Sequence, residues 1–163
     1  MDNKKNYAIV SGRFDDNKYK TPRGAGRFVR NSFFNKVYGK YPEKMGYESV
    51  VLIAAKKNGY DYANLSDARY EHIRPLGQNH HFYEFGASMR TLGYHPLFAI
   101  GRFFIYFVTN KPIGRRGALY MLYHYLFYKP KDNGYDSMYP EDIREFTRKI
   151  QSNKIKSILK LKP

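Results

Sequence analysis

Residues 46–60 read GYESVVLIAAKKNGY, and this stretch decides the fold class. The apolar run 50–55 fits either a buried strand or a buried helix by length alone. The ending Lys56-Lys57-Asn58-Gly59 favours a helix, because cations and then a glycine suit a helix C-terminus. Extended segments are predicted on both sides of Ser66-Asp67. A helix followed by extended chain predicts an α/β fold.

The residues before this helix predict a loop, a strand-like segment and one short helix. Tyr7–Val10 is a short apolar patch, and residues 12–23 are predicted to form a loop. The pattern becomes strand-like over residues 24–30. Asn31 can cap a short helix over residues 32–38, which Gly39 would end.

The composition changes towards helix after residue 77. A helix is predicted over residues 80–92, with Gly93 as its stop, and another from Pro140 to about Ser152. Residues 97–108 and 118–128 form two apolar, aromatic-rich runs flanked by cations. Each has about a dozen residues, short of the ~20 that cross a bilayer as a helix. They fit either core helices or helices in a membrane interface, so we expect an α/β region over 1–77 and a helical, basic region over 78–163, packed as one unit.

The charge of the chain implies an anionic partner. Its 163 residues carry a formal net charge of +15 and include 17 tyrosines and 12 phenylalanines. Nucleic acid, anionic lipid and phosphorylated substrates all fit such an excess. The chain has no cysteine and its first residues lack the apolar run of a secretory signal, which fits the cytoplasm.

Glu48 is the candidate catalytic residue because it stands at the start of the predicted helix 49–58. The positive end of the helix dipole favours an ionised carboxylate, which can accept a proton from a hydroxyl group. The alternative is an acid that only suits a helix start.

His72 and several arginines are candidate anion-binding residues. A neutral imidazole after a strand can bind a divalent metal or a phosphate oxygen, and a lone histidine also fits a structural role. The guanidinium fork matches phosphate geometry. The arginines of interest are Arg27, Arg30, Arg74, Arg90, Arg102, Arg115 and Arg116.

Several short motifs follow one another in a familiar order. They are residues 24–34 (GAGRFVRNSFF), Tyr41-Pro42-Glu43, Tyr47-Glu48, Asn58-Gly59-Tyr60, residues 72–77 (HIRPLG) and residues 86–97. The series resembles the second half of family-2 glycosyltransferases of the GT-A type, in particular archaeal-type membrane-associated members. Glu48 matches the family's acceptor-activating acid, eleven residues before Gly59, although position 47 is Tyr47 where the family has an acid.

The resemblance implies a partial GT-A-like α/β fold and an inverting transfer from a nucleotide-sugar donor to a lipid-linked or glycan acceptor. Glu48 would deprotonate the acceptor. Donor phosphates would meet Arg30, His72 and Arg74, and His72 could also bind the divalent cation, Mg or Mn, that the family uses. Acceptor or lipid would meet Arg90, Arg102, Arg115 and Arg116.

The donor-side Asp-x-Asp motif of the family does not occur in the chain. A separate N-terminal transferase half is therefore an expected partner, and the inner face of the membrane is the expected location. Two alternatives stay open. One is a module that binds single-stranded nucleic acid, which high positive charge and interleaved aromatic residues suit. The other is a non-catalytic membrane-surface protein derived from the enzyme.

Overall fold

The computed structural model describes residues 6–14, 22, 26–37, 39–70 and 81–160. Over these residues the chain is a mixed α/β protein with a three-stranded sheet and six helices. It divides into two compact units: Met1–Pro42 with Tyr47–Leu76, and Glu43–Gly46 with Gly77–Pro163. The division lies close to the boundary expected after residue 77, except that Glu43–Gly46 belongs to the second unit.

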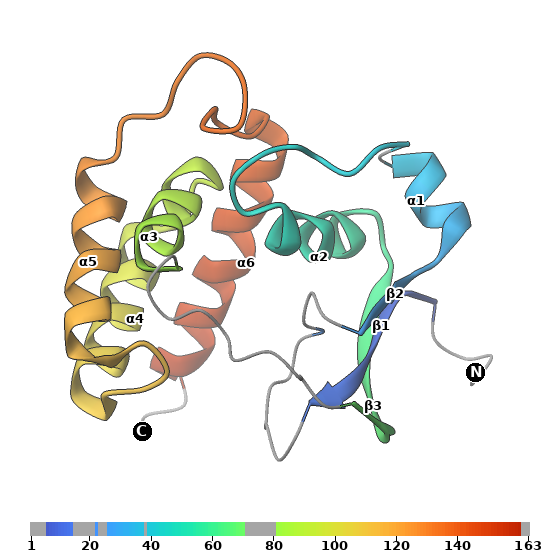
Figure 1. Ribbon diagram of the computed structural model, residues 1–163, viewed down its shortest axis with the longest axis horizontal. Coiled ribbons are helices and arrows are strands. Elements are labelled where there is room, and N and C mark those ends of the chain that lie inside the picture. Colours follow the sequence, from blue (N-terminus) through green and yellow to red (C-terminus); the bar gives the residue numbers. More distant parts are fainter. Residues whose placement is uncertain (1–5, 15–21, 23–25, 38, 71–80, 161–163) are drawn as a thin grey trace. The chain divides into compact units, whose positions relative to one another are not determined.

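The first unit is built on the central strand β1 (Tyr7–Phe14), which lies between β2 (Arg27–Val29) and β3 (Asp61–Tyr70) (Figure 1). β1 pairs antiparallel with β2 and parallel with β3. Parallel strands need a long crossover connection. The crossover contains β2 and two helices, α1 (Asn31–Val37) and α2 (Tyr47–Lys57).

The core of the first unit comes from β1 and the apolar side of α2. Consecutive residues of β1 from Ala8 to Ser11 are buried, so both faces of the central strand are covered. The helix buries Val50, Val51, Ala54 and Ala55, which recur at the spacing of one helix face. The apolar run 50–55, whose length fits either a strand or a helix, is therefore part of an amphipathic helix.

The helices predicted for the first unit are confirmed as α1 and α2, and two predictions about extended chain are wrong. The predicted loop over residues 12–23 begins too early, because β1 continues to Phe14. The predicted break at Ser66-Asp67 lies inside the continuous strand β3. There the register moves from Gly12↔Leu65 to Arg13↔Arg69, so a bulge accommodates the polar residues without ending the strand.

The second unit is helical. Its helices are α3 (His81–Thr91), α4 (Pro96–Thr109), α5 (Gly114–Phe127) and α6 (Glu141–Lys160). The predicted helix over 80–92 and the two apolar runs are confirmed as α3, α4 and α5. The helix expected to end near Ser152 continues to Lys160, since no glycine or proline interrupts the amphipathic pattern of the basic tail.

A core of apolar side chains joins α3, α4 and α5. Its buried members are Met89, Ala99, Met121 and Tyr125. Phe85, Tyr94, Phe103, Tyr106 and Ile113 pack against them. α3 and α5 approach closely at Gly86, where a β-carbon would stand 2.2 Å from the Met121 carbonyl oxygen and 2.7 Å from the Tyr125 nitrogen. No side chain fits at this position, so glycine permits the packing of the two helices.

We predict that Gly86→Ala destabilises the second unit. The added methyl group meets backbone atoms of α5, so the helices must separate, at a cost of about 1–3 kcal/mol or more in the free energy of unfolding. Gly101→Ala is the matched control, because a β-carbon at Gly101 of α4 meets nothing within 4 Å. In that control the free energy of unfolding should rise by about 0.5–1 kcal/mol, because alanine has a higher helix propensity than glycine.

Urea-induced unfolding followed by circular dichroism measures both variants. Equal stability of the Gly86→Ala and Gly101→Ala proteins would contradict the close contact between α3 and α5.

Candidate functional site

Glu48 lies in the first turn of α2, at the edge of the sheet where β1 and β3 have their carboxyl ends. The Arg27 guanidinium donates a hydrogen bond from Nη1 to the Glu48 carbonyl oxygen, at 3.0 Å. Arg27 pairs with Ser11 of β1, beyond the middle of that strand. At the other end of α2, Lys56 contacts Asp61, which pairs with Tyr7 at the amino end of β1. The helix therefore begins at the carboxyl edge, where open α/β sheets place ligand-binding groups.

The Glu48 side chain is exposed at this edge. No hydrogen bond or ion pair involves its carboxylate among the residues that the structure describes, so the acid does not cap its own helix there. Its position in the first turn of α2 places it in the positive field of the helix dipole. A solvent-accessible carboxylate without a partner can receive a proton from a substrate hydroxyl.

The structure separates Arg30 from Glu48 and brings Arg27 to it instead. Arg30 donates from Nη1 to the Asn6 side-chain oxygen, at 2.6 Å, next to the amino end of β1. Arg27 and Arg30 both belong to the predicted strand-like segment. Only the antiparallel register of β2 decides which of them reaches the carboxyl edge. His72 and Arg74 lie outside the described residues.

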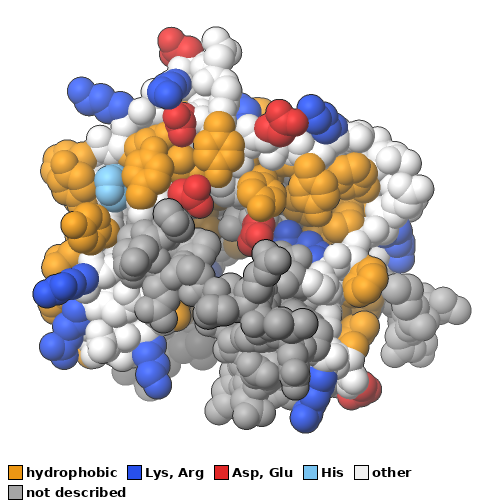
Figure 2. Space-filling view, viewed as in Figure 1, with side chains coloured by type: hydrophobic (Ala, Val, Ile, Leu, Met, Phe, Trp, Pro, Cys, Tyr) orange, Lys and Arg blue, Asp and Glu red, His pale blue; other side chains and the backbone are white. Residues whose placement is uncertain are grey.

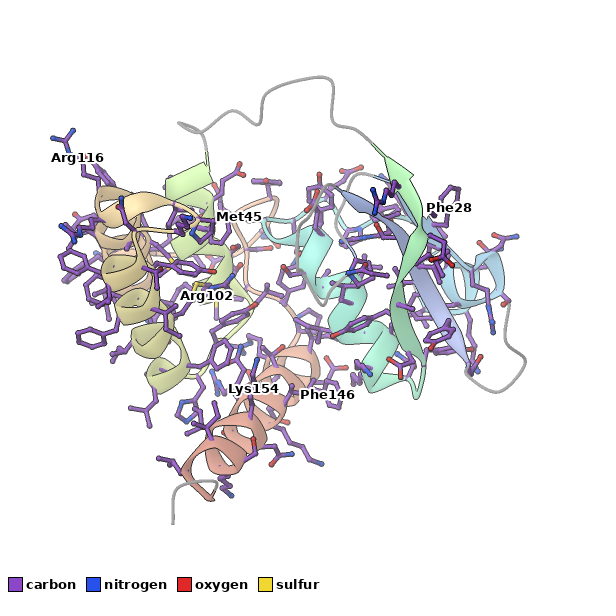
Figure 3. All side chains as sticks on the ribbon, turned by 90° about the horizontal axis from the view of Figure 1, so that it is seen from below. Phe28, Met45, Arg102, Arg116, Phe146 and Lys154 are labelled. Carbon is purple, nitrogen blue, oxygen red and sulfur yellow. The ribbon has the colours of Figure 1, made fainter. Side chains whose placement is uncertain are left out.

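Arg102 points into the second unit (Figure 3). Its Nε donates to the Tyr106 hydroxyl at 2.7 Å, and its guanidinium carbon lies 5.5 Å from the centre of the Phe85 ring. Burial raises the pKa of the Tyr94 phenol, and the neighbouring Arg102 opposes this rise. The contacts join α3 to α4, a packing role that the sequence did not suggest.

The other predicted acceptor-side arginines are exposed. Arg116 projects away from the helices (Figure 3). Arg115 donates from Nε to the Phe107 carbonyl oxygen at 3.3 Å, which ties it to the end of α4. Arg90 stands in the last turn of α3.

The α4–α5 pair carries an exposed apolar surface, which we call the outer face. Its residues are Leu97, Ile100, Phe104, Ile105 and Val108 of α4 with Leu119, Tyr120, Tyr123, Leu126 and Phe127 of α5. Their exposed fractions run from 38% at Ile100 to 72% at Val108. Figure 2 shows apolar side chains gathered over α5, with lysine and arginine side chains at one end of them.

The chain segment that carries the outer face contains cations but no acidic residue. No aspartate or glutamate occurs between residues 85 and 131. Lys111, Arg115 and Arg116 stand at the turn between α4 and α5, and Lys129 follows α5. Contiguous exposed apolar surfaces of this kind mark interaction sites. The sequence identified both apolar runs but could not show that each has an exposed side.

The described residues offer neither a metal-binding cluster nor a membrane-spanning helix. Among the described residues, no group of three or more histidine or acidic side chains could hold a metal ion. Within the same residues, no helix combines the length and the apolar character needed to cross a bilayer. Comparison of the chain with family models, with curated proteins and with solved structures gives no match.

We predict that Arg102→Ala lowers the free energy of unfolding by about 1–3 kcal/mol, because it removes the charged hydrogen bond to the Tyr106 hydroxyl and the contacts with the Phe85 and Tyr106 rings. Arg116→Ala is the control and should change stability by no more than about 0.5 kcal/mol. Urea denaturation measures both. Equal, small effects would show that the Arg102 guanidinium contributes no more than a surface charge.

Proposed function

We propose that the chain is the acceptor-side part of an inverting sugar transferase with a GT-A-like α/β fold. The observation that supports this best is the exposed Glu48 carboxylate at the carboxyl edge of the parallel pair β1–β3. The ordered motifs that resemble family-2 glycosyltransferases agree with it. A nucleotide-sugar would be the donor, and a lipid-linked or glycan hydroxyl the acceptor.

In the proposed reaction, Glu48 accepts the proton of the acceptor hydroxyl while the hydroxyl oxygen attacks the anomeric carbon of the sugar. The bond between that carbon and the donor's phosphate oxygen breaks, and a nucleoside diphosphate leaves. Attack opposite the leaving group inverts the configuration. General-base catalysis of this kind contributes about 10²–10⁴-fold in rate.

The donor side of this proposal rests on the resemblance alone. His72 and Arg74 are the proposed contacts of the donor phosphates, and Mg or Mn at His72 belongs to the same proposal. Arg27 is a better placed neighbour of Glu48 than Arg30, because its guanidinium holds the start of α2. A separate chain that carries an Asp-x-Asp motif would complete the donor site.

We predict that Glu48→Gln lowers sugar transfer at least about 100-fold without changing stability, since the amide keeps the shape of the side chain but cannot accept the proton. The assay measures transfer from labelled UDP- and GDP-sugars to polyprenyl phosphate and glycan acceptors. It is run with the chain alone and with the product of an adjacent reading frame that encodes Asp-x-Asp.

Glu145→Gln, a change at an exposed acid of α6, is the matched control. Transfer that survives Glu48→Gln would remove Glu48 from the reaction. Absence of transfer and of UDP, GDP or manganese binding in both settings would contradict the enzyme proposal.

A second function, binding to an anionic membrane surface, is favoured by the outer face. Helices with one apolar side and flanking cations lie in the interface of a bilayer. Each apolar side chain that leaves water contributes about 1.5–3 kcal/mol when fully buried, and each cation near an anionic surface about 1 kcal/mol. The absence of acidic residues between 85 and 131 suits such a surface. Peripheral attachment would bring the chain to a lipid-linked acceptor.

We predict that the chain floats with vesicles of phosphatidylglycerol and phosphatidylcholine, and that the double change Leu97→Gln, Val108→Gln reduces the bound fraction at least about tenfold. These side chains are 62% and 72% exposed, so the two changes should have little effect on the free energy of unfolding. Phe28→Gln is the control, because Phe28 of β2 is 71% exposed and lies in the first unit.

Binding should also fall as salt rises, because screening weakens the attraction of the cations. An unchanged bound fraction in the double variant would exclude the outer face as the contact. Salt-sensitive binding to a single-stranded oligonucleotide, with no effect of the double variant, would favour the nucleic-acid alternative instead.

A further inference from the structure

A cleft of about 860 Å³ lies within the second unit, between the ends of several helices. The last turn of α3, the start of α4, the chain that joins α5 to α6 and the first turns of α6 all contribute to it. Its lining includes the cations Arg90, Lys131, Arg144 and Arg148, with one acid, Asp132, among the lining residues that the structure describes. The lining therefore carries more cations than acids.

Two of these cations approach the same tyrosine from different helices. Burial raises the pKa of the Tyr125 phenol, and the positive charges of Arg90 on α3 and Arg148 on α6 oppose the rise. The Tyr125 hydroxyl itself donates to the Tyr94 carbonyl oxygen at 2.9 Å. Arg90, Tyr125 and Arg148 all line the cleft, so two arginines from different helices face the same cavity.

Three of the four lining cations, Lys131, Arg144 and Arg148, also have partners within the protein. Lys131 contacts the Asp136 carboxylate at 3.0 Å, and their hydrogen bond is the main cause of the lowered pKa of Asp136. Arg144 forms an ion pair with Glu141. Arg148 donates from Nε to the Gly93 carbonyl oxygen at 3.1 Å and lies 4.0 Å from Glu141.

Arg90 and Arg144 leave hydrogen-bond donors unused. No hydrogen bond or ion pair engages the Arg90 guanidinium among the described residues. The Nε of Arg144 is buried and has no hydrogen-bond partner there. A buried donor without an acceptor costs about 1–3 kcal/mol, a cost that a ligand oxygen would remove. Guanidinium groups with unused donors can bind an anion.

We propose that this cleft binds the phosphate group of an organic phosphate. Arg90 and Arg148 hold the phosphate oxygens, because the guanidinium fork matches their geometry. The cleft is far larger than a phosphate ion and lies in the size range of small-molecule sites. Tyr94, Pro96, Pro130 and Met138 give it apolar walls for an organic body. Phosphate binding in this cleft does not depend on sugar transfer by Glu48.

Three probes test the cleft on the full chain: inorganic phosphate, phenyl phosphate and vesicles that contain phosphatidic acid. Calorimetry measures the soluble probes, and flotation measures the vesicles. Phenyl phosphate should bind more tightly than inorganic phosphate, and Arg90→Gln should weaken its binding at least about tenfold, the loss of one charged hydrogen-bonding group. Lys149→Gln, which removes an exposed cation of α6 outside the cleft lining, should change the affinity by less than about twofold.

Nuclear magnetic resonance of the unaltered chain supplies a readout that needs no variant. Phenyl phosphate should shift the ring signals of Tyr94 and Tyr125 more than those of Tyr120 and Tyr123. If only the vesicles bind, and Arg90→Gln but not Lys149→Gln weakens their binding, the phosphate belongs to a lipid headgroup. If no probe binds, if both variants behave alike, or if the shifted signals lie outside the cleft, the proposal is wrong.

Discussion

The close approach of α3 and α5 at Gly86 is the constraint on which the second unit depends. Because this residue has no side chain, the backbone of α5 comes within contact distance of α3. The approach buries Met121 and Tyr125 against Met89, and α4 completes the same core through Ala99. Once these positions face inwards, the periodicity of a helix leaves the residues between them outside. The exposed apolar outer face is thus a consequence of how the core is packed.

The parallel pairing of β1 with β3 has a comparable role in the first unit. It requires the chain to cross from one strand to the other, and α2 makes most of that crossing. The helix must run back along the sheet, so its first turn, with Glu48, stands at the carboxyl edge. Arg27 fixes this arrangement through a bond to the backbone of Glu48, which leaves the carboxylate itself available.

The positive charge of the chain serves several different purposes. Arg102 is enclosed by the rings of Phe85 and Tyr106 and stabilises the helical core. Arg115 and Arg116 border the outer face in the first turn of α5, while Arg90 and Arg148 face a cleft. The guanidinium group suits all three settings because it combines a flat surface that stacks on aromatic rings with a fork of donors. Net charge alone therefore says little about which arginine meets a ligand.

The sequence by itself determined the α/β class, most of the helices and the place of Glu48 at a helix start. These features depend on local signals: apolar periodicity, terminal cations and the glycines at positions 59 and 93. The sequence did not determine the extent of β1, the bulge at Ser66-Asp67 or the end of α6, because neighbouring elements decide these. It also selected Arg30 where the register of β2 brings Arg27 to Glu48. The exposed outer face and the presence of Arg90 and Arg148 in one cleft required the tertiary structure, since contacts between helices distant in sequence decide which side of each helix meets water.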